Sequence, residues 1–126
     1  MIKSPEARGK LEKLTPYTYG APVVLLVCYD MNTVWKNPRE HLLKDYNSGE
    51  QDAAIAAVNM MYAAEELGIH TLWARGFDAR EVRMELGLPE SVVPALILDM
   101  GYPVPDSRPH PIHFRRMPVE DMVTEL

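Results

Sequence analysis

The sequence predicts one domain that combines helices and strands, in the α/β or α+β class, with helices on both faces of a sheet. Two continuous apolar runs, at residues 22–29 and 92–100, are typical of strands covered on both faces. Between them, an alanine-rich segment at residues 48–68 is typical of a long helix. The length of 126 residues fits a single domain, 1–126.

The remaining elements follow from helix caps and helix breakers. Asp78 is a favoured N-cap with Glu81 three residues later, and Gly87 ends that helix. Pro118 suits the first turn of a final helix. The predicted order is a helix at 5–14, a loop at 15–20, a strand at 22–29, a loop at 30–46 with one helical turn near 38–44, a helix at 48–67, a strand at 69–73, a helix at 79–86, a strand at 92–100, a proline-rich connection at 101–111 and a helix at 118–125.

The segment 48–67 is apolar on almost every side. Ser48 is a good N-cap with Gln51 three residues later, as a capping box requires, and Gly68 ends the helix. A helix that is apolar all round must be enclosed, and a chain of this length has little material to enclose it. We therefore expect a homodimer in which two copies meet along this helix. No membrane span is expected, because polar or charged residues interrupt or flank the apolar run: Glu50, Gln51, Asp52, Asn59, Glu65 and Glu66.

Charge and cysteine content narrow the classes of function. The formal net charge is −5, which disfavours nucleic-acid binding through phosphate neutralisation. Cys28 is alone, so no intrachain disulfide can form, and a reducing, cytoplasmic location is the simplest expectation. Because Cys28 lies in an apolar strand, it is interpreted as a small core residue and not as a nucleophile. The first 14 residues are charged and contain no apolar signal-peptide segment.

No strong catalytic motif stands alone in this sequence. There is no nucleotide-binding glycine motif, no paired-cysteine motif and no metalloprotease motif. His110 and His113 have a spacing that can bind a metal, but they lie in a proline-rich loop. Because real sites need three or four oriented ligands, an ordinary loop without a metal is expected there.

Two segments are better candidates for a binding site. In residues 73–78 a strand ends, Gly76 allows a ligand to approach the backbone closely, and a helix begins at Asp78. Free backbone N–H groups in such a bend can donate to a flat heterocycle. The commoner alternative is an ordinary strand-to-helix turn. In residues 114–118, Arg115 and Arg116 precede a predicted helix and can bind a phosphate, whereas the commoner alternative is a solvated basic pair.

These segments follow one another in an order that resembles a known family. An Ala-Pro strand start at residues 21–22 precedes the long helix, which begins with acidic residues and ends as Ala-Ala-Glu-Glu-Leu-Gly at 63–68. Trp-Ala-Arg-Gly-Phe at 73–77, Leu-Gly-Leu-Pro at 86–89 and Gly-Tyr-Pro at 101–103 come next. Arg116 lies two residues before Pro118. Over residues 21–123 the chain is similar to the carboxy-terminal part of the FMN-dependent nitroreductases.

The resemblance implies an α+β fold with a central, mostly antiparallel sheet flanked by helices and the long helix at a dimer interface. It implies FMN as cofactor, NAD(P)H as electron donor, and a nitroaromatic, quinone or similar small molecule as electron acceptor. No side chain is assigned a catalytic role, because the cofactor carries the redox chemistry. The residues that the resemblance places at the cofactor are Trp73, Ala74, Arg75, Gly76, Arg115 and Arg116.

In the resemblance, the backbone N–H of Arg75 or Gly76 lies near the N5 or O4 edge of the isoalloxazine ring, and Arg116, helped by Arg115, holds the phosphate. The family's Arg-x-Ser-x-Arg segment has no counterpart here, and Phe114 stands where the family often has Lys. The chain therefore resembles a truncated family member. A second hypothesis is a truncated domain without catalysis, acting as a dimerising interaction module or a small-ligand-binding module. A third is an unrelated α/β domain.

Overall fold

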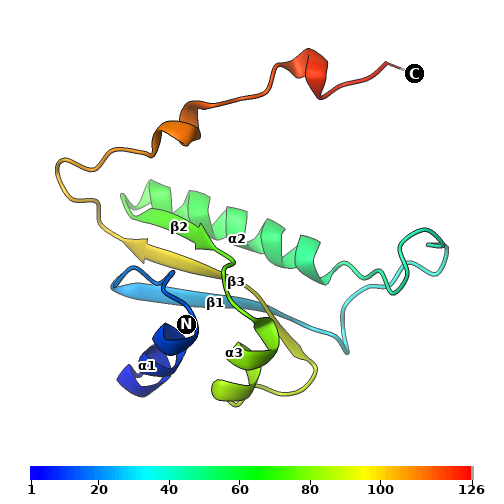
Figure 1. Cartoon of the computed structure of the whole chain (residues 1–126), viewed down its shortest axis with the longest axis horizontal. Coiled ribbons are helices and arrows are strands. Elements are labelled where there is room, and N and C mark those ends of the chain that lie inside the picture. The colour runs from blue at the N-terminus through cyan, green and yellow to red at the C-terminus, as the bar shows by residue number, and fades with distance from the viewer. Residues whose placement is uncertain (126) are drawn as a thin grey trace.

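The computed structural model describes residues 1–125. Figure 1 shows a small three-stranded sheet with helices on either side, followed by a C-terminal segment that leaves the body. The elements are α1 (Pro5–Leu14), β1 (Val23–Asp30), α2 (Gly49–Glu66), β2 (His70–Ala74), α3 (Ala79–Glu85), β3 (Val92–Gly101), and two short 3-10 turns, η1 (Pro111–Phe114) and η2 (Val119–Asp121).

The sheet has the strand order β1-β3-β2, and both pairings are antiparallel. Leu98 on β3 pairs with Leu25 on β1 and with Trp73 on β2, so β3 is the central strand. A β-bulge lies between Val27 and Cys28. These pairings confirm the predicted α+β fold with a mostly antiparallel sheet.

Both faces of the sheet are covered, as the continuous apolar strands predicted. On one face, Ala57 of α2 packs with Leu96 and Leu98 of β3. On the other face, Leu11 of α1 and Val82 of α3 pack with Ile97, and each of these three residues has no exposed surface. Figure 1 shows α2 on one side of the strands and α1 and α3 on the other. The side chains alternate along β3 between the two clusters, which is the pleat of a strand.

The helix α2 has one buried stripe and one uncovered face. Its buried residues, Gly49, Ala53, Ala57 and Ala64, are small and let the helix lie close to the sheet. On the opposite side, Ile55 is 63% exposed and Tyr62 is 70% exposed. The chain therefore covers one face of this helix and leaves apolar side chains on the opposite face exposed to solvent. Within the described residues, no helix has the length and apolar character needed to cross a membrane.

The predicted capping box at the start of α2 is wrong. Ser48 has helical backbone angles, φ −81° and ψ −1°, and its side chain makes no capping hydrogen bond. Its hydroxyl donates instead to a carboxylate oxygen of Asp52 at 2.5 Å. The side-chain carbonyl of Gln51 accepts from the hydroxyl of Tyr46 at 2.5 Å. The two side chains that a capping box needs are thus bonded elsewhere.

Two predicted helical segments do not form. The helix expected at 118–125 is reduced to the three-residue turn η2, because no body element packs on it and short helices are marginal without packing. The helical turn expected near 38–44 is replaced by non-helical turns and bends. There the carboxylate of Glu40 accepts from the backbone N–H groups of Leu42 at 2.6 Å and Leu43 at 2.9 Å, and such bonds compete with a helix.

Candidate functional site

The bend at residues 73–76 lies at the open edge of the sheet, where β2 ends. The strand ends at Ala74, and α3 begins after Asp78, whose carboxylate accepts from the backbone N–H of Glu81 at 2.9 Å. The predicted N-cap is confirmed, and the strand ends one residue after the predicted end at 73. Because β2 is an edge strand, the bend has a sheet neighbour on one side only.

A cavity of about 370 Å³ opens at this bend. Its volume falls within the usual range for small-molecule sites. All four residues that the sequence placed here line it together with three others, in the set Tyr17, Tyr19, Leu72, Trp73, Ala74, Arg75 and Gly76. We call this cavity the aromatic pocket. Its aromatic wall comes partly from the loop before β1, which the sequence analysis did not assign to a site.

The loop at residues 15–20 is attached to the bend by a hydrogen bond. The hydroxyl of Thr15 donates to the carbonyl of Gly76 at 2.9 Å, and accepts from the backbone N–H of Tyr17 at 3.2 Å. The ring of Tyr17 lies against Gly76, and a Cβ atom at position 76 would be only 2.2 Å from it. The rings of Tyr17 and Tyr19 are 6.0 Å apart and tilted by 56°. At Gly76 the group that approaches the backbone closely is the ring of Tyr17, whereas the sequence predicted a ligand there.

The backbone at the bend offers hydrogen-bond donors. Within residues 1–125, no acceptor is found for the N–H groups of Arg75 and Gly76. The side chain of Arg75 is engaged elsewhere. Its guanidinium lies 4.8 Å from the ring centroid of Phe77, donates to the carbonyl of Phe77 at 3.2 Å, and lies 3.8 Å from a carboxylate oxygen of Glu50. At the pocket, Arg75 thus offers its backbone N–H, because its guanidinium is paired with Glu50 at the start of α2.

The structure does not bring Arg115 and Arg116 to the aromatic pocket within one chain. Both are exposed, and no element of the body contacts η1 or η2. Arg116 donates to the carbonyls of His113 and Arg115, so its hydrogen bonds stay within its own segment. We call residues 102–125 the C-terminal arm. The two arginines could approach a ligand in the pocket only if the arm of this chain, or of another copy, came to it.

The other residues considered in the sequence, His110, His113 and Cys28, make contacts within their own segments. The ring of His110 accepts from the backbone N–H of Ile112 at 3.2 Å, and His113 packs edge-on to Phe114 with centroids 5.2 Å apart. Among residues 1–125, no group of three or more histidine, cysteine or acidic side chains is placed to hold a metal ion. Cys28 is partly buried and belongs to neither core cluster, and burial raises the pKa of its thiol.

Comparison with known proteins identifies the family to which this architecture belongs. The model of the nitroreductase family matches residues 4–102. A relative from Archaeoglobus fulgidus is 33% identical over 107 residues, covering 76% of this chain and 56% of the relative. A relative from Methanothermobacter thermautotrophicus is 27% identical over 110 residues, covering 82% of this chain and 53% of the relative. Both are provisionally named NADH dehydrogenase/NAD(P)H nitroreductase.

Solved structures agree with this result. A nitroreductase family protein from Clostridium difficile 630 superposes with a TM-score of 0.80 at 32% identity, covering 98% of this chain and 69% of that protein. A protein from Staphylococcus epidermidis, provisionally named NAD(P)H:FMN oxidoreductase, has the same fold with a TM-score of 0.76 at 19% identity, covering 99% of this chain and 73% of that one. The chain spans about half the length of the curated relatives that it matches. With this fold and the family match over residues 4–102, the chain belongs to the nitroreductase family.

Proposed function

We propose that this chain is an FMN-dependent oxidoreductase of nitroreductase type, or the part of one that carries the flavin-facing bend. Electrons would pass from NAD(P)H through the flavin to a nitroaromatic, a quinone or a similar small acceptor. The observation that carries the proposal is the aromatic pocket, which Tyr17, Tyr19 and Trp73 line together with residues 74–76. The names of the two archaeal relatives and of the Staphylococcus epidermidis protein support the same chemistry.

The residues present fit the ring of FMN better than its phosphate. The pocket offers aromatic surfaces for a flat ring. For the ring's polar edge it offers the N–H groups of Arg75 and Gly76, which have no acceptor among the described residues. When bound, the flavin supplies the hydride and electron transfer, and the protein's donors tune its electron acceptance. A phosphate would need Arg115 and Arg116, which lie on the C-terminal arm. The proposal therefore requires the arm to approach a pocket in the assembled protein.

We also propose that the protein is a homodimer through the helix at residues 48–67. The uncovered face of α2 and the C-terminal arm support this proposal, because both expose large apolar side chains such as Tyr62 and Phe114. Large exposed apolar patches mark interaction sites. A two-fold dimer would bury the same face of α2 on both copies.

A flavin titration tests the proposed activity. We expect the purified protein to bind FMN saturably at micromolar concentration and then to oxidise NADH or NADPH when a quinone or nitroaromatic is supplied. Replacing both Arg115 and Arg116 with alanine should weaken FMN binding more than riboflavin binding, because riboflavin has no phosphate. Arg108→Ala, an exposed arginine on the same arm, is the matched control and should leave both affinities unchanged.

A titration without flavin binding would decide against the proposed activity. A folded protein that shows no saturable flavin binding would contradict the proposal. It would favour the alternative of a truncated domain without catalysis, acting as a dimerising interaction module or as a site for another small ligand. The presence or absence of a dimer, measured by sedimentation, does not decide between these two functions, so the titration is the discriminating experiment.

A further inference from the structure

Asp99 is a buried carboxyl group without a hydrogen-bond partner. It lies on the central strand β3, paired with Val24 on β1 and Leu72 on β2, and its side chain is on the face covered by α1 and the loop at 15–22. The residue is 3% exposed, and neither carboxylate oxygen has a partner among the described residues. A buried polar group without a partner is costly, and much more so when charged. Burial accordingly raises the pKa of Asp99 to about 6.

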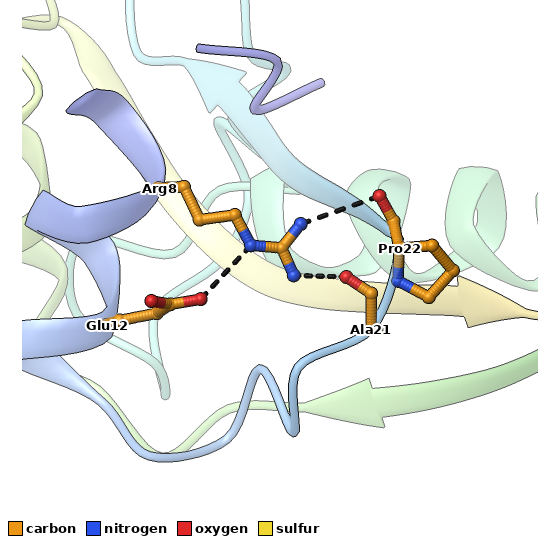
Figure 2. A network of polar contacts seen from close by, with 4 residues as sticks. All are labelled: Arg8, Glu12, Ala21 and Pro22. Atoms are coloured by element: carbon orange, nitrogen blue, oxygen red, sulfur yellow. Dashed lines mark hydrogen bonds and ion pairs between the residues drawn. The ribbon is translucent and has the colours of Figure 1, made fainter. Parts of the chain in front are cut away.

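Arg8, the cation whose charge acts on Asp99, is held by other groups. Figure 2 shows the guanidinium of Arg8 reaching from α1 to the start of β1, where it donates to the carbonyls of Ala21 and of Pro22, the latter at 3.5 Å. Its Nε donates to Glu12 at 3.0 Å. The charge of Arg8 partly opposes the rise in the pKa of Asp99, yet the two side chains form no ion pair among the described contacts. Ala21, whose carbonyl accepts from Arg8, lines one cavity with Asp99, so the guanidinium is bonded to the loop at the edge of the space around this carboxyl.

Few other titratable groups face this carboxyl. Tyr19 from the loop and His70 from β2 line, with Asp99, a cavity of about 190 Å³. From α1, Arg8 is the charged group that acts on Asp99, and Glu12 is paired with Arg8. Tyr19 also lines the aromatic pocket, so the two cavities share one wall.

We propose that Arg8 has two alternative acceptors and that the protonation state of Asp99 selects between them. With Asp99 protonated, the guanidinium holds the carbonyls of Ala21 and Pro22, as in this structure. When Asp99 releases its proton to solvent, the guanidinium turns to the carboxylate and releases the loop at 15–22. Asp99 is thus a positioning residue for the wall of the aromatic pocket. The inference does not depend on the identity of the ligand in that pocket.

The turn at residues 18–21 should respond when Arg8 releases the loop. Tyr19 and Gly20 both have positive φ angles, 45° and 68°, and the backbone N–H of Ala21 closes the turn on the carbonyl of Thr18 at 2.8 Å. A residue other than glycine at positive φ is held there by its surroundings at some cost. Loss of the contacts from Arg8 removes part of that support. The turn would then open more often, and Tyr17 and Tyr19 would move with it.

Amide hydrogen exchange of Ala21 tests the proposal without any flavin. The exchange rate in the wild type is divided by the rate in Asp99→Asn at the same pH, which cancels the intrinsic pH dependence of exchange. We expect a ratio near one at about pH 5 and a ratio of roughly three to ten at about pH 7.5, the effect of losing about one hydrogen bond. In Arg8→Met the amide should exchange fast at both pH values, because no guanidinium holds the loop.

His70→Gln is the matched control, since His70 lines the same cavity as Asp99. The exchange rate of Ala21 in His70→Gln, divided by the rate in His70→Gln/Asp99→Asn, should change with pH as the wild-type ratio does. A ratio that stays constant with pH in the wild type, or that loses its pH dependence in His70→Gln, would overturn the proposal. If the amide signal of Ala21 is weak, the Nε resonance of Arg8 gives the same test. It should shift with pH in the wild type and stay constant in Asp99→Asn.

Discussion

The ring of Tyr17 occupies the space beside Gly76 that a side chain at position 76 would need. A Cβ atom built there would lie 2.2 Å from one ring carbon of Tyr17 and 2.5 Å from another. These residues are far apart in sequence, and the hydrogen bond from Thr15 to the carbonyl of Gly76 holds their segments together. The shape of the aromatic pocket therefore depends on the absence of a side chain at residue 76.

Gly76→Ala should displace Tyr17 and destabilise the chain by about 1–2 kcal/mol, because inserting a methyl group into an occupied space forces the neighbours apart. Thermal or denaturant unfolding measures the change. Gly9→Ala is the matched control, since nothing lies within 4 Å of a Cβ atom at that position in α1. Alanine there should be neutral or stabilise the helix by about 0.5–1 kcal/mol. A Gly76→Ala variant as stable as the wild type would contradict this contact.

Neighbouring positions on α2 should respond differently to glutamate. Ala57 has no exposed surface and packs on β3, so Ala57→Glu should prevent folding by burying an unpaired carboxylate, at a cost of several kcal/mol. Val58 is 41% exposed, and Val58→Glu should leave the helical circular dichroism signal unchanged. If the proposed dimer forms, Val58→Glu should also shift sedimentation towards the monomer.

Asn59→Glu adds the same charge to an exposed position beside Val58 and controls for charge alone. It should weaken self-association less than Val58→Glu does. A Val58→Glu protein that sediments as a well-folded dimer would refute the assignment of this face to the interface. A folded Ala57→Glu protein would contradict the packing of α2 on the sheet.

Stability should fall as pH rises from about 4 to about 6 because of Asp99. Burial raises the pKa of its carboxyl from 3.8 to about 6, so the folded chain binds this proton more tightly than the unfolded chain. The favourable effect is complete below the unfolded pKa and is lost as pH rises through the folded one. Between about pH 4 and pH 7 this contributes a loss of up to about 3 kcal/mol.

Asp99→Asn should remove this dependence. Relative to the wild type, the free energy of unfolding of the variant should therefore be higher at about pH 7 than at about pH 4, by up to about 3 kcal/mol. Urea unfolding at the two pH values measures the difference, and any pH-independent cost of the buried amide cancels. Asp106→Asn, at an exposed aspartate on the C-terminal arm, should show no such change. An equal response of the two variants would argue against a buried, proton-linked carboxyl at position 99.

Local signals in the sequence were enough to predict most of the elements. The continuous apolar runs predicted β1 and β3 within one residue at each end, and Asp78 and Gly87 bounded α3 because capping depends on adjacent residues. The C-terminal helix was predicted wrongly from Pro118, since a favourable first residue cannot stabilise a helix that packs against nothing. The bend at residues 73–76 was recognised from its glycine and from the family resemblance.

By itself, the sequence determined the order of helices and strands, the covering of both sheet faces and the location of the bend. Only the tertiary structure decided which residues surround that bend, which face of α2 stays open, and that Asp99 is buried with no partner in the part of the chain that the structure describes. The physical reason is that strand and helix formation depend on residues a few positions apart. The contacts of Tyr17 with Gly76 and the burial of Asp99 arise when segments distant in the chain pack together, and no local pattern encodes them.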